Sequence, residues 1–380
     1  MQNVDAAGLG IGDDYPTRIM GVLNVSKESP YKPSVFDDHA AAAEYVDERL
    51  IGEGADIVDV GLESANKKFE VLSAEGELDR LDTAIDTMNS VSGDAVFSIE
   101  TRYHEVAEAA LDAGFDMVND ICGFADPEMP RVCEEYDVAV AKMASPPDLE
   151  RPGAVERPDD IYDALALNGL TDKTIVDPAF GGWSEAKTLE DDRETFHRLR
   201  EFRGYGQPIL VSINRKNFLR ELAGRDTEGA LPVSLAATAM AIERGAHVVR
   251  THDVAETRDA ALIGDAFAAD RLRDASVGVE ELDVTTPREV GRHLDRLGAA
   301  SDHADRAVVR TFELTGLAAG DDETLAAALG PAAGFAPADD GTGGLLYGTP
   351  ASLRAVADAV SERDVSERLT DALAAIRTAL

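Results

Sequence analysis

Positive charge is in short supply in this chain. Its 380 residues carry 36 Lys and Arg against 73 Asp and Glu, a formal net charge of −37. So acidic a surface repels nucleic acid phosphates and anionic lipids, which excludes both as general partners. Only eight of the basic residues are Lys. Acid-rich, Lys-poor usage suits molar salt, where charges are screened within about 3 Å, so we expect a cytoplasmic protein from a salt-adapted organism.

Cysteine and long apolar runs are also scarce. Cys122 and Cys133 have no C-x-x-C spacing and no neighbouring His, so they predict neither a zinc site nor a disulfide framework. No segment approaches 18 consecutive apolar residues, and no apolar stretch follows basic residues at the N-terminus. We therefore expect no membrane anchor and no leader. Hydrophobic residues still make up 44% of the chain, enough for a sizeable globular core.

Short β-branched runs alternate with helical patterns through most of the sequence. The runs span 17–25, 55–61, 95–101, 116–121, 138–143, 173–178, 208–214 and 247–253, and helix-like segments include 40–52, 103–113, 189–202 and 232–244. The runs are apolar throughout rather than alternating, as in parallel strands buried on both faces. Eight such units predict a (β/α)8 TIM barrel over residues 17–270. A doubly wound sheet is the alternative, but it would not need eight.

The two ends of the chain do not continue this regular alternation of strand-like and helix-like segments. Residues 1–16 read as an N-terminal extension, and residues 277–380 as an additional C-terminal α+β domain. In that domain we expect strands at 279–286, 307–314 and 343–349, and helices at 287–297, 323–329, 350–361 and 365–380. It carries no recognisable motif. Capping the barrel, building a homodimer and holding a partner all stay open as its role.

Almost every predicted strand ends in residues able to do chemistry. In chain order these are Asn24, Glu63, Glu100, Asn119, Asp120, Lys142, Asp177, Asn214, Arg215, Lys216, Arg250, His252 and Asp253. The carboxyl ends of barrel strands converge on one mouth, where barrel enzymes place their active sites. The pattern therefore predicts an enzyme.

The charges at this mouth indicate two kinds of contact. Arg215, Lys216, Arg250 and His252 follow strands seven and eight, where barrels often bind phosphate, so they suit a diphosphate. Glu100, Asn119 and Asp177 could satisfy the N–H groups of a flat heterocycle such as a 2-aminopyrimidinone. The alternative for both groups is ordinary ion pairing within the barrel.

Seven ordered motifs make a more specific resemblance. They read IMGVLNVS at 19–26, DIVDVGLES at 56–64, SIET at 98–101, MVNDICG at 117–123, IVDP at 175–178, NRKNF at 214–218 and VRTHDV at 249–254. In type and order they resemble the signatures of dihydropteroate synthases, and the likeness spans residues 17 to about 267. Enzymes of that family join 6-hydroxymethyl-7,8-dihydropterin diphosphate to p-aminobenzoate and release diphosphate.

The resemblance implies a role for each matching residue. The pterin would be held by Glu100, Asn119, Asp177, Lys216 and Arg250. Lys216, Glu100 and Asp177 would also be catalytic, with Glu100 stabilising the cation left as diphosphate departs. Asn24, Arg250 and His252 would take the diphosphate, and Asn24 would hold its Mg²⁺.

Departures from the family pattern cluster in loops. After strand one the family's Asn-Val-Thr-Pro-Asp-Ser-Phe is replaced at 24–30, and after strand two Ser-Thr-Arg-Pro-Gly is replaced at 64–68. The loop after strand six differs at 181–187, and Glu100 replaces a shorter Asp. These loops would contact the second substrate, so a different acceptor arylamine is one hypothesis. Two further hypotheses are a pterin-dependent methyltransferase and a non-catalytic pterin-binding paralogue.

Overall fold

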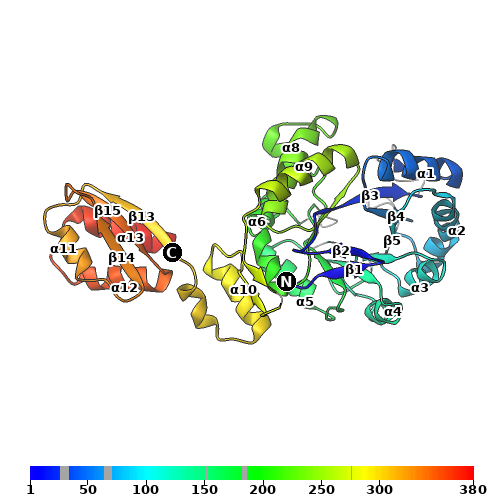
Figure 1. Ribbon diagram of the computed structural model, residues 1–380. Coiled ribbons are helices and arrows are strands. Elements are labelled where there is room, and N and C mark those ends of the chain that lie inside the picture. Colours follow the sequence, from blue (N-terminus) through cyan, green and yellow to red (C-terminus); the bar gives the residue numbers. More distant parts are fainter. Residues whose placement is uncertain (26–33, 64–70, 150–152, 154, 182–185, 275) are drawn as a thin grey trace. The chain divides into compact units, whose positions relative to one another are not determined.

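A computed structural model describes residues 1–25, 34–63, 71–149, 153, 155–181, 186–274 and 276–380 of the chain. The chain divides into two compact units, Met1–Glu281 and Leu282–Leu380 (Figure 1). Each unit has its own hydrophobic core.

The first unit is a barrel of eight parallel strands. They are β3 (Arg18–Asn24), β4 (Ile57–Gly61), β5 (Val96–Thr101), β6 (Met117–Asp120), β7 (Ala139–Met143), β8 (Thr174–Asp177), β9 (Leu210–Val211) and β10 (Val248–Thr251). Their order in the sheet is β8-β7-β6-β5-β4-β3-β10-β9. A parallel bridge between Val176 and Ile209 joins the two ends of this sheet. The predicted (β/α)8 barrel is therefore confirmed.

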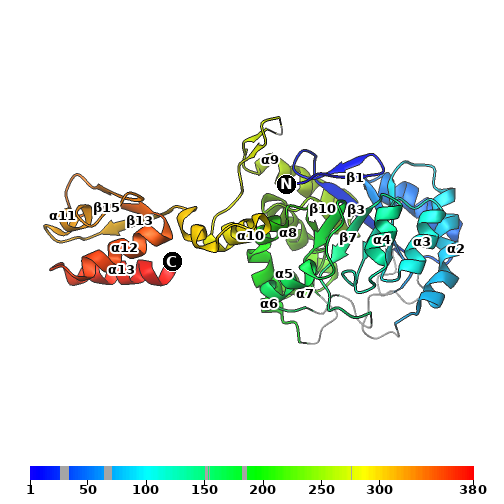
Figure 2. The same cartoon turned by 90° about the horizontal axis from the view of Figure 1, so that it is seen from below.

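Helices connect the strands and surround them (Figures 1 and 2). They are α1 (His39–Tyr45), α2 (Ala74–Ser90), α3 (His104–Asp112), α4 (Met129–Glu135), α5 (Pro158–Ala166), α6 (Leu189–His197), α7 (Asn217–Ala223), α8 (Leu231–Glu243) and α9 (Val254–Phe267), with non-α turns at Val46–Ile51, Leu199–Tyr205 and Glu228–Ala230. Local signals start them: Asp38 caps α1, and Thr188 with Asp191 forms a capping box on α6.

The strand pattern decides which side chains enter the barrel. The amino-terminal halves of the strands contribute one apolar cluster inside the barrel, which includes Ile57, Val96, Met117, Ile175 and Val248. Side chains alternate across a strand, so residues two and four positions further on face the same interior. Those positions are occupied by Asp59 and Gly61, Ser98 and Glu100, Asn119, Asp177 and Arg250. The polar site is formed by Asp59, Glu100, Asn119, Asp177 and Arg250 of this set, without Ser98, and is thus stacked directly on the apolar interior.

The N-terminal extension folds as part of this unit. Strands β1 (Val4–Ala6) and β2 (Leu9–Ile11) pair as an antiparallel hairpin. Val4, Ala6 and Ile11 are buried in the same cluster as the amino-terminal halves of the barrel strands. The hairpin therefore closes the end of the barrel opposite the predicted mouth. A three-residue strand gives too short a period-two pattern to be predicted from sequence.

The seventh barrel strand is shorter than expected. Of the predicted run 208–214, only Leu210 and Val211 form β9. The chain then turns, with the Lys216 amide donating to the Ile213 carbonyl at 3.4 Å and Arg215 at φ 52°. This left-handed residue ends the extended run, and α7 begins directly after Lys216.

The second unit has a three-stranded antiparallel sheet in the order β13-β15-β14. Its elements are α10 (Pro287–Leu297), a 3₁₀ turn (Ser301–Arg306), β13 (Arg310–Thr315), α11 (Asp321–Ala326), β14 (Ala333–Pro337), β15 (Gly343–Gly348), α12 (Pro350–Ser361) and α13 (Glu367–Ala379). The predicted strand 279–286 is wrong: only Val279–Glu280 (β12) pairs, with Arg273–Asp274 (β11), in the first unit. β14 was missed because its Gly and Pro disfavour strands.

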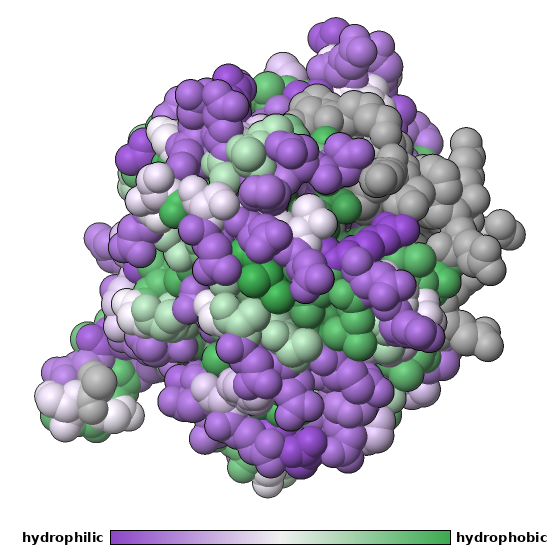
Figure 3. Space-filling model, turned by 90° about the vertical axis from the view of Figure 1, so that its right-hand side faces the viewer, coloured by the Kyte–Doolittle hydropathy of each residue, from purple (hydrophilic) through white to green (hydrophobic). Residues whose placement is uncertain are grey.

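The surface matches the composition. The face seen in Figure 3 is largely hydrophilic, with a smaller band of hydrophobic residues across its middle. Among the described residues, no helix combines the length and the apolar character needed to cross a membrane.

Candidate active site

Arg250 is the centre of a largely buried ionic cluster at the carboxyl ends of the strands, in which the side chains of Arg250, Glu100 and Asp59 are 18%, 12% and 0% exposed. Its Nε donates to Asp59 Oδ2 at 2.7 Å, and its terminal NH2 group donates to Glu100 Oε2 at 2.5 Å. β10, β4 and β5 supply these three residues. Charge-assisted hydrogen bonds of this length in a buried setting hold the guanidinium plane in one orientation.

Glu100 lies where its protonation is finely balanced. Burial raises its pKa to about 7, and the charge of Arg250 opposes that rise while Asp59 adds to it. A carboxyl with such a pKa is partly protonated near neutrality. A small change in its surroundings would therefore change its charge.

Asn119 on β6 and Asp177 on β8 lie beside this ionic cluster. Together with Asp59, Glu100 and Arg250 they form what we call the polar floor. The Asn119 amide donates from Nδ2 to Asp59 Oδ2 at 3.0 Å. Asp177 accepts the Ala179 N–H through Oδ1 at 2.7 Å, and burial raises the pKa of Asp177 to about 6 despite that bond and nearby Lys216. Both side chains are almost fully buried, so the floor offers oxygen acceptors in a region of low dielectric.

Lys216 brings a second positive charge to this floor. Its side chain packs against the backbone of Gly181: a Cβ built there would lie 3.2 Å from Nζ. Gly181 has φ +77°, so glycine is favoured both by conformation and by space. Burial lowers the pKa of Lys216, and the charge of Asp177 opposes the change.

A second group lies at the rim. Asn24 Nδ2 is 3.1 Å from Ser34 Oγ, and Ser34 Oγ is 3.3 Å from His252 Nδ1. Burial and the charge of Arg250 lower the pKa of His252 to about 3. His252 is therefore a neutral hydrogen-bonding group here. Its contact with a diphosphate, which the sequence suggested, would therefore be a hydrogen bond from a neutral imidazole.

Gly61 joins the rim to the floor. A Cβ at this position would lie 3.2 Å from Asn24 Oδ1 and 3.4 Å from Glu100 Oε1. Any larger residue would crowd both oxygens, which belong to the two groups just described. The glycine thus keeps open the space between them.

Several strand-end residues singled out in the sequence have structural partners instead. Arg215 pairs with Asp253 at 2.8 Å and donates to two carbonyls after α7, so its assignment to an anion site is corrected to rim pairing. Lys142 faces outward and donates to carbonyls at the end of α5. Glu63 pairs with buried Arg102 at 3.0 Å.

The loop departures fall mostly beyond the described residues. Positions 26–30, 64–68 and 182–185 lie outside them. Lys187 is described: its Nζ donates to the Ala179 carbonyl at 2.7 Å and lies 3.3 Å from Asp192. It therefore supports the segment directly after Asp177.

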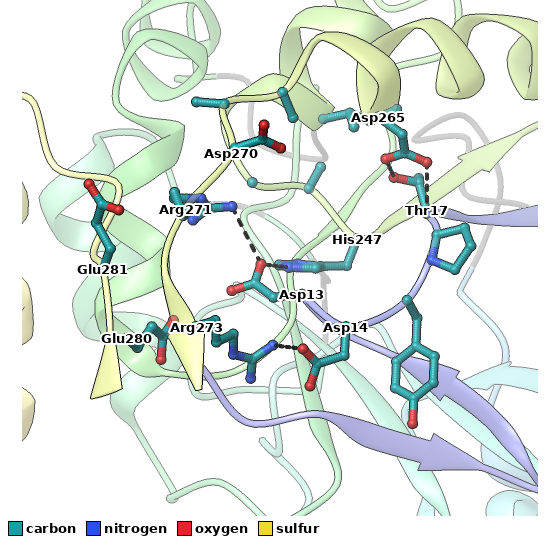
Figure 4. Close-up of a pocket in the computed structure, with 18 of the residues that line it drawn as sticks. Asp13, Asp14, Thr17, His247, Asp265, Asp270, Arg271, Arg273, Glu280 and Glu281 are labelled. Carbon is teal, nitrogen blue, oxygen red and sulfur yellow. Dashed lines mark hydrogen bonds and ion pairs between the residues drawn. The ribbon is translucent and has the colours of Figure 1, made fainter. Parts of the chain in front are cut away.

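A cavity of about 530 Å³ opens at the opposite, amino-terminal end of the barrel (Figure 4). His247 Nδ1 accepts the Ile209 N–H at 3.0 Å, so its Nε2 carries the proton and donates to Asp13 at 3.0 Å. Arg203 also pairs with Asp13 at 2.8 Å. This network ties the segment after the β1–β2 hairpin to the barrel, far along the strands from the polar floor.

The first unit is therefore a (β/α)8-barrel protein with a buried, mixed-charge site at the carboxyl ends of its strands, the arrangement of barrel enzymes. Residues 20–252 match the family model described as pterin binding enzyme. The chain belongs to this family.

Named relatives agree with this assignment. A dihydropteroate synthase of Clostridium beijerinckii is 33% identical over 66% of this chain and 93% of its own length. A probable bifunctional folylpolyglutamate synthase/dihydropteroate synthase of Haloferax volcanii is 36% identical over 66% of this chain. The chain spans only 31% of that haloarchaeal protein. The structure of a Coxiella burnetii dihydropteroate synthase in complex with pteroic acid matches with a TM-score of 0.59 at 26% identity, covering 71% of this chain and 99% of that one.

Proposed function

We propose that this chain is a dihydropteroate synthase, which condenses 6-hydroxymethyl-7,8-dihydropterin diphosphate with p-aminobenzoate, or a related arylamine, and releases diphosphate. The observation that carries the proposal is the buried floor in which Arg250 and Lys216 lie among Glu100, Asn119 and Asp177. Family membership and the named relatives support it. The acidic composition and the haloarchaeal relatives also support salt adaptation.

Two kinds of residue would take part in the reaction: hydrogen-bond acceptors that hold the pterin ring, and charged side chains that stabilise the charges formed as it reacts. In the reaction the amine nitrogen bonds to the pterin methylene carbon, the C–O bond breaks, diphosphate keeps the electron pair, and the amine loses a proton. Asn119 and Asp177 would accept hydrogen bonds from the pterin ring. Glu100 would stabilise positive charge on the pterin as the C–O bond breaks, and Lys216 and Arg250 would complement the ring and the departing anion.

Mg²⁺ is a further part of this proposal. Asn24 donates from Nδ2 to Ser34, which leaves its Oδ1 as a hard oxygen ligand beside Gly61. Mg²⁺ commonly takes one or two protein oxygens and completes its shell with phosphate and water, so the donor fits. When bound, the ion would neutralise charge on the diphosphate.

Diphosphate release tests the function. The protein would be assayed in molar KCl with Mg²⁺ and 6-hydroxymethyl-7,8-dihydropterin diphosphate, with and without p-aminobenzoate. We expect release that depends on p-aminobenzoate, yields dihydropteroate and stops when EDTA removes the metal. Pterin binding without release on any arylamine would contradict the synthase function and favour a methyltransferase or a non-catalytic pterin-binding protein.

The pH dependence of the reaction should report Glu100. The carboxylate is the form that stabilises a cation, and burial raises the pKa of Glu100 to about 7. The charged fraction therefore falls about tenfold per pH unit below that value, and kcat/KM should rise with pH and level off above 7. A Glu100→Gln variant should be slow, and its kcat/KM should not rise with pH over this range. A rise that persists in the variant would show that titration of the substrate, and not of Glu100, causes it.

A further inference from the structure

Asp59 is a fully buried carboxylate in the middle of β4, and the proposed chemistry does not use it. It is 0% exposed. Its Oδ2 accepts hydrogen bonds from Asn119 Nδ2 at 3.0 Å and Arg250 Nε at 2.7 Å. Among the described residues its Oδ1 has no hydrogen-bond partner. Burying a carboxylate is costly, so its two charge-assisted contacts must account for its presence.

The contact with Asn119 fixes the orientation of that amide. A side-chain amide carries one donor end and one acceptor end, and electron density rarely distinguishes them. The carboxylate paired with Arg250 can only accept, so Nδ2 of Asn119 must face Asp59. The Asn119 oxygen is then the end left for a ligand. It joins Asp177 as an acceptor on the floor.

The contact with Arg250 has a parallel effect. Asp59 holds Nε while Glu100 holds the terminal NH2 group of the same guanidinium. With one edge of the planar group fixed from two strands, its remaining terminal nitrogen has a defined direction. One carboxylate oxygen therefore sets the positions of two ligand-facing side chains.

We propose that Asp59 is a positioning residue that selects a heterocycle with an N–H-bearing edge, because it orients Asn119 to present its oxygen and holds Arg250 in place. This inference rests on the proposed function. Asp59 itself touches no reacting atom in it and acts only through its two neighbours.

Pterin affinity of an Asp59→Asn variant is the first test. Binding of 6-hydroxymethyl-7,8-dihydropterin with diphosphate would be followed by calorimetry in molar KCl. The variant keeps the side-chain size, but its amide can donate to Asn119 and so permit the opposite amide orientation. We expect affinity to fall about 10- to 100-fold, the size of loss typical when residues that orient metal-binding side chains are removed.

Ser98→Ala is the matched control. Ser98 is the register partner of Asp59 on β5, is also 0% exposed, and has a hydroxyl with no hydrogen-bond partner among the described residues. Its removal should leave pterin affinity within about twofold. Wild-type protein that fails to bind the pterin would contradict the proposed function. Wild-type binding with equal affinity in Asp59→Asn would overturn the positioning role alone.

Asn119→Asp supplies a second test that does not require Asp59→Asn to fold. The introduced carboxyl can donate to Asp59 only while protonated, and its other oxygen then still faces the ligand. Pterin affinity of this variant relative to wild type should therefore be near normal at acid pH and fall as pH rises. A ratio that does not change with pH would overturn the inference, since a purely structural role gives no such profile.

Discussion

Replacing Lys216 by alanine is expected to lower kcat/KM for p-aminobenzoate-dependent diphosphate release about a thousandfold. Lys216 lies against Gly181, and its charge acts directly on Asp177. Removing a charged donor from a water-poor site costs on the order of 10²- to 10³-fold in rate. It also leaves Asp177 buried with less compensation, so the fall should include weaker pterin binding. Turnover would be measured by product formation, and pterin binding by calorimetry.

Lys173→Ala is the matched control for that variant. Lys173 lies just before β8, at the other end of the barrel, and its Nζ is 2.9 Å from Asp137 Oδ1. Surface pairs of this kind contribute about 0–1 kcal/mol, so this variant should keep wild-type turnover. Turnover of Lys216→Ala within tenfold of wild type, with the same pterin affinity, would contradict a role for Lys216 at the floor.

Much of this site follows from the sequence because strand periodicity is so regular. Once the eight strands are placed, alternation brings Glu100, Asn119, Asp177 and Arg250 to one interior, and the structure brings these four together. The same rule places Lys142 on the outer face, where it binds the carbonyls at the end of α5. Lys142 was grouped with the residues of the mouth because strand positions that face inward and outward were not distinguished.

Other parts could not be predicted because they depend on partners distant in sequence. Arg215 and Asp253 are 38 positions apart, and only the fold shows that they pair. Ser34 was missed for the same reason, since a lone serine between strands carries no pattern. Asp59 did carry a signal: an acidic residue inside an otherwise apolar strand is rarely fully buried unless it is paired. It could have been identified from the run Asp56–Gly61 alone.

The polar floor also indicates how so acidic a protein could bind the diphosphate of the proposed reaction. The formal charge of −37 is spread along the chain, and molar salt screens it within about 3 Å. Arg250 and Lys216 are only partly exposed, so salt screens their charges less than those of the surface. If the diphosphate binds beside them as proposed, their attraction for it should persist at salt concentrations that cancel the repulsion of the surface.

The largest loss of stability is expected from Arg250→Gln. Arg250 is the partner of the fully buried carboxylate of Asp59 and of the largely buried carboxylate of Glu100. Breaking a buried ion pair by removing one partner typically costs about 3–5 kcal/mol, because the remaining charge is left without compensation. We expect a loss of that size in the free energy of unfolding at pH 8, measured by denaturant titration in molar KCl.

The pH dependence of this loss distinguishes unpaired charge from lost packing. Arg250 lowers the pKa of Glu100, which burial has raised to about 7, so without Arg250 that pKa moves higher still. A carboxyl with a raised folded-state pKa adds stability below its unfolded value of about 4.3, and this is lost as pH rises through the folded-state pKa. The difference between wild type and variant should thus be smaller near pH 5, where only Asp59 loses its partner, and grow toward pH 8, where Glu100 loses its partner as well. Arg244→Gln, which removes one bond to the Phe196 carbonyl, should cost about 1 kcal/mol at both pH values. A loss for Arg250→Gln that is equally independent of pH would show that its guanidinium stabilises the barrel by packing rather than by pairing with Glu100.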